Sequence, residues 1–296
     1  MGVVKRKKTI LITGINGFLG SHLAKTLLSD FNIIGLEYDL ENLKRIKEYS
    51  FKIYSSKGNL ENIFKENEIF AIIHAATVYG ENGESIENLI NTNVILPIKL
   101  YELANNYNTQ KFLNTDSFFN KPEYGYSYLA DYTLSKRQVL EWLNLKKGGC
   151  ELVNMKLFHL YGDGDAPNKF VPLILSTLQK NQPFLELTMG LQRRDFVFID
   201  DVAKAYLIVL KNFKKHVGQI SEFEVGTGLS ISIREFIELA KKLTQSHTEL
   251  KFGALPYRKN EIMVAVADNR KLLSLGWKHQ YTLIEGLTTT IRSICQ

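Results

Sequence analysis

Short apolar runs alternate with amphipathic stretches along the first half of the chain. Residues 9–12, 33–36, 51–54 and 70–74 are apolar or β-branched runs of strand length. The longest stretch with apolar positions at helical spacing is 86–106, with Pro97 inside it, which predicts a kink or a late helix start. Strands alternating with helices indicate an α/β fold, which we expect to be a Rossmann-type doubly wound parallel sheet.

The pattern continues into the second half and then loses its regularity. Further strands are predicted over 112–113, 151–157, 197–199 and 223–225, and helices over 38–48, 61–67, 132–145, 169–179, 202–210, 233–243 and from 284, with Asp200 as a cap. The less regular end predicts a smaller mixed lobe. We expect a dinucleotide-binding domain over 1–160 with a return segment near 195–212, and a substrate-binding lobe over 161–296.

A glycine-rich turn follows the first strand. Gly14, Gly17 and Gly20 are spaced three apart, and the residues after them have apolar positions on one helical face. Glycine permits positive φ in a tight turn, and without Cβ it lets a pyrophosphate approach the backbone at a helix N-terminus. The turn therefore predicts a dinucleotide site. An ordinary strand-to-helix turn is the alternative.

An acidic residue ends the second predicted strand. Glu37 lies seventeen residues beyond Gly20, where a parallel strand presents its last side chain to the adenosine ribose. A carboxylate accepts hydrogen bonds from both ribose hydroxyls and repels a 2′-phosphate, which favours NAD over NADP. The alternative is a solvated strand end. Asn59 could hydrogen-bond the adenine or lie in a turn, and the small residues Ala75 and Ala76 let backbone approach the cofactor.

Polar side chains follow the strand at 112–113, and a Tyr–Lys pair follows them. Tyr132 and Lys136 are four apart in a predicted helix and share one face. An ammonium beside a phenol favours the phenolate and should lower a pKa that is about 10 when unperturbed. Thr115 could hydrogen-bond the same substrate oxygen. This pattern indicates acid/base catalysis, although a solvated Tyr–Lys pair is the alternative.

Charge and composition limit the classes of binding partner that we expect. The net charge is +6, but the lysines are dispersed and no aromatic-basic alternation typical of nucleic-acid surfaces occurs, so a small phosphorylated substrate is preferred. Arg193 and Arg194 precede a buried strand and suit phosphate. Cys150 and Cys295 lack metal spacing and give no disulfide framework. No apolar run reaches membrane-spanning length. We expect a cytoplasmic protein with no metal, membrane or nucleic-acid partner.

With these motifs in hand, the chain resembles the extended short-chain dehydrogenase/reductase family, in its nucleotide-sugar branch, over nearly its whole length. The matching segments are 13–20, His74-Ala75-Ala76, Asn93-Val94, Thr115, Tyr132-x-x-x-Lys136, Tyr161-Gly162, Arg194-Asp195-Phe196 and Leu275-Gly276-Trp277. Within the branch, residues 112–119, 168–172 and 260–263 are most similar to the CDP-abequose and CDP-paratose synthases, which are 4-keto reductases.

The resemblance implies roles for individual residues. Tyr132 would be the acid/base at a sugar hydroxyl, Lys136 would also bind the nicotinamide ribose, and Thr115 would hold the reacting oxygen. Arg194 and Arg258 would grip the substrate diphosphate. The expected cofactor-binding residues are Gly14, Asn16, Gly17, Phe18, Leu19, Gly20, Glu37, Asn59, Leu60, Ala75, Ala76, Thr77, Asn93 and Lys136, and the expected substrate-binding residues are Ser117, His159, Lys169, Phe170, Arg194, Arg258 and Glu261.

Three departures from the family pattern bear on the reaction. Ser117 stands where the 4,6-dehydratases carry a glutamate that removes the C5 proton, so dehydration is not expected. His159 stands where many members have an asparagine that contacts a substrate phosphate. Glu37 followed by Tyr38 favours NAD, whereas an NADPH-using abequose-type reductase would be expected to carry a basic or neutral residue.

These expectations combine into an NAD-dependent oxidoreductase acting at C4 of a nucleoside-diphosphate sugar. The sugar would be a CDP- or GDP-linked hexose, deoxyhexose or heptose, oxidised to a 4-keto sugar for surface polysaccharide synthesis. The alternatives are an NAD(P)H-dependent 4-keto reductase, a 4-epimerase, or a cofactor-sensing regulator without chemistry. Helices 86–106 and 132–145 could pack across a twofold axis, so we expect a homo-oligomer, a dimer or tetramer.

Overall fold

The computed structural model describes residues 7–81, 83–124, 128–146, 148–212 and 220–294. Within it the chain forms two compact units. The first comprises residues 1–120, 129–156 and 206–223, and the second comprises residues 121–128, 157–205 and 224–296. Two strands and one helix run from one unit into the other. Each unit is described by itself below.

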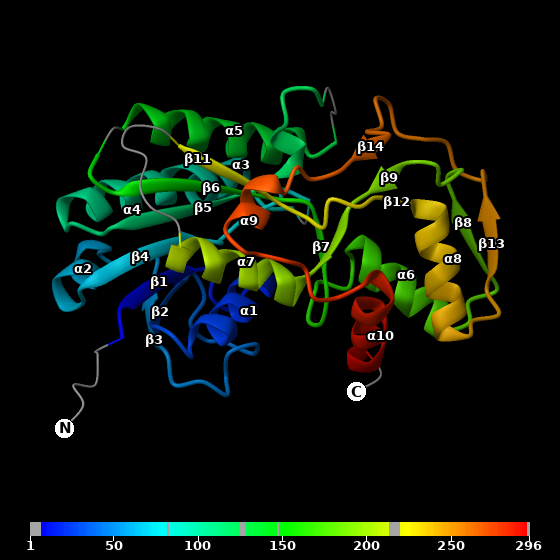
Figure 1. Ribbon diagram of the computed structural model, residues 1–296, viewed down its shortest axis with the longest axis horizontal. Helices are drawn as coiled ribbons and strands as arrows, with labels where there is room; N and C mark the ends of the chain where they lie inside the picture. The colour runs from blue at the N-terminus through cyan, green and yellow to red at the C-terminus, as the bar shows by residue number, and fades with distance from the viewer. Residues whose placement is uncertain (1–6, 82, 125–127, 147, 213–219, 295–296) are drawn as a thin grey trace. The chain divides into compact units, whose positions relative to one another are not determined.

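The first unit is built on a seven-stranded sheet whose strand order is β11-β6-β5-β4-β1-β2-β3 (Figure 1). The strand pairs β3–β2, β2–β1, β1–β4 and β4–β5 are parallel. Central strands are apolar throughout because helices cover both faces of such a sheet. The predicted doubly wound α/β fold is confirmed. The strands are β1 (Thr9–Thr13), β2 (Asn32–Glu37), β3 (Lys52–Ser55), β4 (Ile69–His74), β5 (Lys111–Ser117), β6 (Glu151–Leu157) and β11 (Ser221–Val225).

The helices of the first unit bury apolar stripes on this sheet. Leu100 of α4, Val139 of α5 and Phe64 of α2 share one core with Phe112 and Leu11 of the sheet. Helix α1 lies at the opposite face (Figure 1). The helical segments are α1 (Phe18–Leu27), α2 (Glu61–Glu66), α3 (Ile86–Ile90), the π-helical turn η1 (Asn91–Ile95), α4 (Leu96–Asn106), the 3₁₀ turn η2 (Phe118–Asn120) and α5 (Ala130–Leu145).

The helix predicted over 86–106 is interrupted before its proline. A π-helical turn, η1, separates α3 from α4, and Pro97 lies in the first turn of α4. Proline is tolerated there because the first N–H groups of a helix have no intrahelical acceptor. The irregularity is therefore the wide turn upstream of Pro97, where one side chain of the turn, that of Asn93, is completely buried.

Two further predictions of local structure are wrong. Residues 38–48 form turns instead of a helix, and the Asn16 side chain binds this segment by donating to the Asn42 carbonyl and accepting from the Arg45 N–H, each at 2.9 Å. A polar segment without an apolar stripe has little to gain from helix formation. Asp200 lies in the first turn of α7, which begins at Ile199, so it is not the residue before the helix.

The second unit carries small sheets and helices that share an aromatic core. Strands β7 and β10 pair in parallel, β12, β9 and β14 form a second sheet, and β8 pairs in parallel with β13. Phe236 of α8 packs on Phe196 at 4.1 Å and on Phe170 at 5.7 Å between ring centroids. The elements are β7 (His159–Tyr161), α6 (Phe170–Gln179), β8 (Phe184–Leu187), β9 (Arg193–Arg194), β10 (Phe196–Phe198), α7 (Ile199–Asn212, which continues into the first unit), β12 (Ile231–Ser232), α8 (Ile233–Thr244), β13 (Glu249–Phe252), β14 (Val264–Ala265), α9 (Arg270–Ser274) and α10 (Leu283–Ile294).

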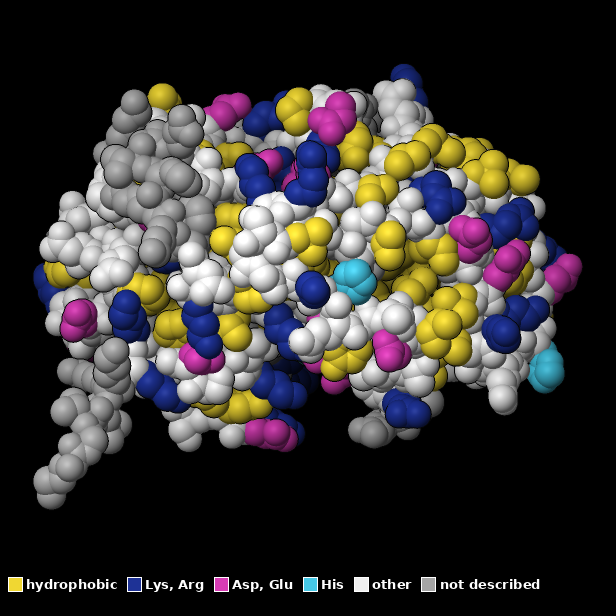
Figure 2. Space-filling model, in the orientation of Figure 1, with side chains coloured by type: hydrophobic (Ala, Val, Ile, Leu, Met, Phe, Trp, Pro, Cys, Tyr) yellow, Lys and Arg dark blue, Asp and Glu magenta, His cyan; other side chains and the backbone are white. Residues whose placement is uncertain are grey.

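Charged side chains are interspersed on the face that Figure 2 shows, where Lys and Arg lie among Asp and Glu without a continuous basic patch. Among the described residues, no helix has the length and apolar character needed to cross a bilayer. The same residues contain no group of three or more His, Cys, Asp and Glu side chains placed to hold a metal ion.

Candidate functional site

The glycine turn between β1 and α1 is closely packed on backbone. Gly14 has φ of +63°, and a Cβ there would lie 2.8 Å from the Cα of Ala76. Gly17 is the residue before α1, no side chain caps the helix, and its first turn, which contains Phe18, Leu19 and Gly20, has no acidic residue. The first N–H groups of a helix lack intrahelical acceptors, so this end favours an anion such as a pyrophosphate.

Glu37 ends β2 beside the glycine turn. Its Oε1 accepts a hydrogen bond of 2.5 Å from the Asn16 N–H. Burial raises the pKa of this carboxyl, while the hydrogen bonds from backbone N–H groups act in the opposite direction. The acid thus lies at the turn, in the place where the sequence predicts a ribose ligand. The side chain of Asn16 is engaged with residues 42 and 45, so only its backbone faces Glu37.

Thr13 organises the loop that follows β4. Its hydroxyl accepts the N–H groups of Ala75 and Ala76, at 3.1 and 3.0 Å, and meets His74 Nδ1 at 2.9 Å. With both lone pairs engaged, the hydroxyl proton goes to Nδ1, which places the ring proton of His74 on Nε2. Burial holds the pKa of His74 well below its usual range, so the ring is neutral. Among the described residues, the buried hydroxyl of Thr77 has no hydrogen-bond partner and is available to a ligand.

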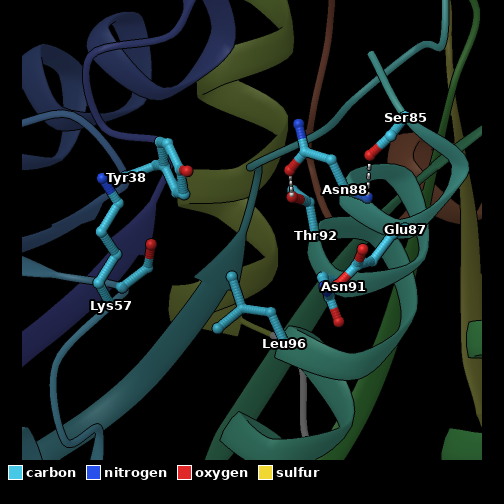
Figure 3. Close-up of a pocket in the computed structure, with 9 residues that line it drawn as sticks. Tyr38, Lys57, Ser85, Glu87, Asn88, Asn91, Thr92 and Leu96 are labelled. Carbon is cyan, nitrogen blue, oxygen red and sulfur yellow. Dashed lines mark hydrogen bonds between the residues drawn. The ribbon is translucent and has the colours of Figure 1, made fainter.

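A pocket of about 310 Å³ is lined on one side by Tyr38, the residue that follows Glu37 (Figure 3). Lys57 Nζ lies 4.0 Å from the centre of the Tyr38 ring, and in the view the segment from α3 to α4 forms the other wall. Asn59, expected at the adenine, is not among its lining residues, and its side chain accepts the Glu61 N–H at 3.0 Å. Leu60 packs against the core of the first unit. The lining residues are Tyr38, Ser56, Lys57, Ser85, Glu87, Asn88, Asn91, Thr92 and Leu96.

Taken together, the first unit fits an NAD molecule. It has an uncapped helix N-terminus at a glycine turn, an acid at the end of β2, a pocket lined by the residue after that acid and, among the described residues, an unpaired Thr77 hydroxyl. Sequence reasoning named the turn, the acid and Thr77, but not the pocket residues from α3 and η1. Ser56 and Lys57 had a signal, since they follow the carboxyl end of a strand.

Tyr132 and Lys136 lie on the buried face of α5, at 5 % and 2 % exposure. Lys136 Nζ donates to the Thr115 carbonyl at 2.9 Å and lies 5.7 Å from the centre of the Tyr132 ring. Burial lowers the pKa of Lys136 to about 8, and the negative charge of Asp116 opposes this shift. The ammonium therefore persists at neutral pH.

The predicted lowering of the Tyr132 pKa is wrong for the protein alone. Burial raises the pKa of this phenol well above its usual value, Tyr79 and Asp116 act in the same direction, and the hydrogen bond with Ser117 acts in the opposite direction. Desolvation outweighs the nearby ammonium because a phenolate loses more hydration than one charge returns at this distance. Tyr132 is accordingly a neutral proton donor in the resting protein.

The two hydroxyl residues after β5 have different partners. Thr115 shares a hydrogen bond of 2.8 Å with the hydroxyl of Tyr206, whereas Ser117 is the hydroxyl bonded to Tyr132. Asn93 was expected at the cofactor, but its side chain binds both the N–H and the carbonyl of Val78, at 2.9 and 2.8 Å. Sequence reasoning missed Tyr206, which lies 91 residues from its partner.

Asp116 is a buried carboxylate between these hydroxyls that sequence reasoning did not select. It accepts the Ser117 N–H at 2.7 Å and the Asn154 side chain at 2.9 Å. Asn154 also donates to Glu222, which pairs with Lys156 at 2.9 Å. A signal existed, because Asn114 and Asp116 in one strand and Asn154 and Lys156 in its neighbour are each two apart, which places each pair on one face of its strand.

The remaining predicted residues lie in the second unit. Arg194 and Glu261 form an ion pair of 2.6 Å with both side chains nearly buried, at 8 % and 12 % exposure. Arg258 lies 3.6 Å from the centre of the Tyr128 ring. Burial, with the charge of Arg194, lowers the pKa of His159 to about 3, so the ring is neutral.

Two other predicted residues of the second unit lie at the start of α6. Lys169 is the residue before the helix, and Phe170 opens it. The Phe170 ring stacks on Phe196 at 6.2 Å between centroids. Asp195, between Arg194 and Phe196, accepts four hydrogen bonds from Thr227, Gly228 and Ala267. These bonds fix the backbone that carries Arg194.

Comparison with known proteins gives a family match and full-length relatives. The model of the NAD dependent epimerase/dehydratase family matches residues 10–226. A CDP-abequose synthase of Salmonella typhimurium is 36% identical, over 97% of this chain and 99% of the relative. A putative UDP-glucose 4-epimerase of Methanocaldococcus jannaschii is 28% identical, over 95% and 97%.

Solved structures share the fold at low sequence identity. UDP-glucuronic acid 4-epimerase from Bacillus cereus, in complex with NAD and UDP-4-deoxy-4-fluoro-glucuronic acid, has a TM-score of 0.85 at 21% identity and covers 97% of this chain and 99% of that one. UDP-glucose 4-epimerase from Thermotoga maritima has a TM-score of 0.83 at 20% identity, with 97% and 98% covered. These matches and the cofactor site agree with the resemblance and the NAD cofactor predicted from the sequence, and the chain belongs to the NAD dependent epimerase/dehydratase family.

Proposed function

We propose that this protein is an NAD-dependent oxidoreductase that transfers hydride at C4 of a nucleoside-diphosphate sugar. The observation that carries the proposal is the arrangement of Tyr132, Lys136 and Ser117 in the same unit as the glycine turn and Glu37. A buried phenol with a hydroxyl partner and a nearby ammonium is a proton-exchange site. The CDP-abequose synthases at 36% and 35% identity support a nucleotide-sugar substrate.

Each residue has a defined part in this chemistry. NAD supplies the hydride acceptor or donor when bound. Tyr132 exchanges the proton of the C4 oxygen, and Ser117 shares a hydrogen bond with that phenol. Lys136, charged at neutral pH, stabilises the phenolate once the substrate displaces water, and its bond to the Thr115 carbonyl fixes the ammonium. Ser117 cannot remove a C5 proton as a carboxylate would, which argues against dehydration.

The direction of hydride transfer has two candidate answers. Glu37 favours NAD, which suits oxidation of the hydroxyl to a 4-keto sugar, the direction predicted from the sequence. The 36% identity with a CDP-abequose synthase over 97% of the chain favours the reverse, reduction of a 4-keto sugar. The residues are the same in both directions. Either product would suit surface polysaccharide synthesis, in the cytoplasm.

The test follows the reduced cofactor by absorbance. One sample of the purified protein is denatured, and any nucleotide that it releases is identified by chromatography. A second, native sample is incubated with NAD and CDP-, GDP- or UDP-sugars, or with NADH and a CDP-4-keto sugar. NADH formation identifies oxidation, and NADH consumption identifies reduction. Epimerised sugar without net NADH would identify a 4-epimerase, and cofactor binding without turnover of any sugar would favour the regulator.

Replacement of Arg194 tests the diphosphate role proposed for the second unit. Arg194→Lys keeps a charge opposite Glu261 but loses the planar fork that binds phosphate bidentately. We expect the KM for the nucleotide sugar to rise about 10–100-fold, the range of one or two charge-assisted hydrogen bonds, with little change in kcat. The neighbouring Arg193→Lys is the control, because Arg193 is 44% exposed and bonds Ser230. Equal effects in both variants would contradict the role of Arg194.

The buried charge of Asp116 predicts a pH effect. Asp116 raises the pKa of both Tyr132 and Lys136. In Asp116→Asn both pKa values fall, so Lys136 loses its proton at a pH below its present pKa of about 8. The parts of the pH–rate profile that report Tyr132 and Lys136, its two limbs, both move to lower pH. The exposed Asp131→Asn on the same helix as Lys136 is the control. A profile that stays in place, or moves to higher pH, would refute this role.

The helices predicted to form an oligomer interface expose large apolar side chains. Exposure is 65% for Ile86, 51% for Leu134, 51% for Trp142 and 74% for Leu145. Apolar surface of this kind on α3 and α5 supports the proposed homo-oligomer. Light scattering after size-exclusion chromatography measures its mass, and a monomeric mass would contradict it.

A further inference from the structure

A second tyrosine lies directly on the proposed catalytic phenol. The rings of Tyr79 and Tyr132 stack with their centroids 4.8 Å apart and an interplanar angle of 27°. Tyr79 comes from the loop after β4 and is half-buried, while Tyr132 on α5 is buried. The stack therefore joins two segments that are distant in sequence.

One buried side chain links the backbone beside Tyr79 to the backbone of Tyr132. Asn93 in η1 accepts the Val78 N–H at 2.9 Å and donates to the Val78 carbonyl at 2.8 Å. The same amide donates to the Ser135 hydroxyl at 3.0 Å, and that hydroxyl donates to the Tyr132 carbonyl at 2.7 Å. Because Asn93 has no exposed surface, these bonds are shielded from water.

From these contacts we infer that Tyr79 is a positioning residue for Tyr132, holding the phenol ring in the orientation needed for proton exchange and keeping water from one face. The inference rests on the proposed function, in which Tyr132 exchanges the proton. Stacked aromatic rings have a preferred geometry. Asn93 also fixes the backbone beside Tyr79 and, through Ser135, the backbone of Tyr132. The ring of Tyr132 therefore has little freedom to tilt. Small misplacement of a reacting group lowers rate more than binding.

The stacked ring of Tyr79 has this role, and its hydroxyl does not. Two variants distinguish the ring from the hydroxyl. Tyr79→Phe keeps the stack and should retain kcat within about twofold. Tyr79→Leu removes it and should lower kcat about tenfold, with both KM values within about twofold, since a misplaced reacting group affects rate more than binding. Tyr49→Leu is the matched control, because Tyr49 is also half-buried and stacks on Phe51 at 5.2 Å in the same unit.

A pH profile distinguishes positioning from general destabilisation. Burial is the largest cause that raises the pKa of Tyr132, and the charge of the Tyr79 phenol adds to it. Tyr79→Phe lacks that phenol but keeps the stack, so it is the reference. Water admitted in Tyr79→Leu should move the pH–rate limb that reports Tyr132 to lower pH than in Tyr79→Phe. The other titratable groups facing this phenol, Asp116 on β5, Lys136 on α5 and Tyr206 on α7, are unchanged. Loss of folding alone would lower the active fraction without moving the limb.

Four results would overturn the inference: an unchanged kcat in Tyr79→Leu, an equal loss of kcat in Tyr79→Phe, a rise in KM that matches the fall in kcat, or a Tyr132 limb at the same pH in Tyr79→Leu and Tyr79→Phe. Tyr79→Met replaces Tyr79→Leu if the latter fails to fold. If the wild-type protein turns over no nucleotide sugar, the proposed function fails by itself. The ultraviolet titration of the Tyr132 phenol is then obtained as the difference from Tyr132→Phe. An equal Tyr132 pKa in Tyr79→Leu and Tyr79→Phe would refute the effect of the stacked ring.

Discussion

Tyr132→Phe is expected to lower turnover of the nucleotide sugar by about 10²–10⁴-fold, the usual contribution of a positioned acid/base. Phenylalanine keeps the ring that stacks on Tyr79 and removes only the hydroxyl bonded to Ser117. The affinity for NAD and the thermal unfolding midpoint should therefore stay near the wild-type values. Steady-state kinetics, with fluorescence titration of NAD, measures both quantities.

Tyr107→Phe is the control for this substitution. Its hydroxyl bonds Glu61 of α2 at 2.8 Å in the same unit, and no role in the site is proposed for either residue, so turnover should not change. If Tyr132→Phe kept turnover within a few-fold, another group would have to exchange the proton. A large loss would also exclude a cofactor-sensing regulator, since a regulator has no turnover to lose.

Gly20→Ala is expected to weaken NAD binding by about a hundredfold, about 2.8 kcal/mol. A Cβ at Gly20 would overlap the carbonyl oxygen of Gly14 and would lie 2.8 Å from its carbonyl carbon and 2.9 Å from the Cα of Ile15. All three are backbone atoms, so the turn itself must move away from the helix N-terminus. Isothermal titration calorimetry with NAD measures the loss.

Gly149→Ala is the matched control, because a Cβ there meets nothing within 4 Å. Its NAD affinity should equal that of the wild type. A Gly20→Ala protein that is folded by circular dichroism and binds NAD normally would show that the cofactor does not use this turn.

Local spacing made much of the first unit predictable. Strand length, the glycine spacing and the Tyr132–Lys136 spacing each depend on neighbours within a few residues, and the sheet, the turn and the shared face of α5 follow from them. The π-helical turn was not predictable in this way. Its side chain Asn93 is held by Val78 and Ser135, which lie 15 and 42 residues away.

The other site contacts that the sequence did not predict join residues far apart in the chain. Asp116 is held by Asn154 of another strand, and Thr115 is bonded to Tyr206 of a helix far along the chain. Even a correct choice of Tyr132 did not give its pKa direction, because burial of a side chain depends on every element around it. Residue type and spacing indicate what chemistry is available, while its electrostatic setting depends on tertiary packing.

The chain path has a consequence for dissecting the protein. The first unit is assembled from residues 1–120, 129–156 and 206–223, so no single cut of the chain releases it intact. A gene fragment ending at residue 160 would encode the glycine turn, Tyr132 and Lys136, yet it would omit Tyr206 and the edge strand β11. Such a fragment would leave β6 with an unpaired edge, and we expect it to aggregate during expression. Truncated versions of this protein must therefore retain the later segment, either in one chain or by co-expression.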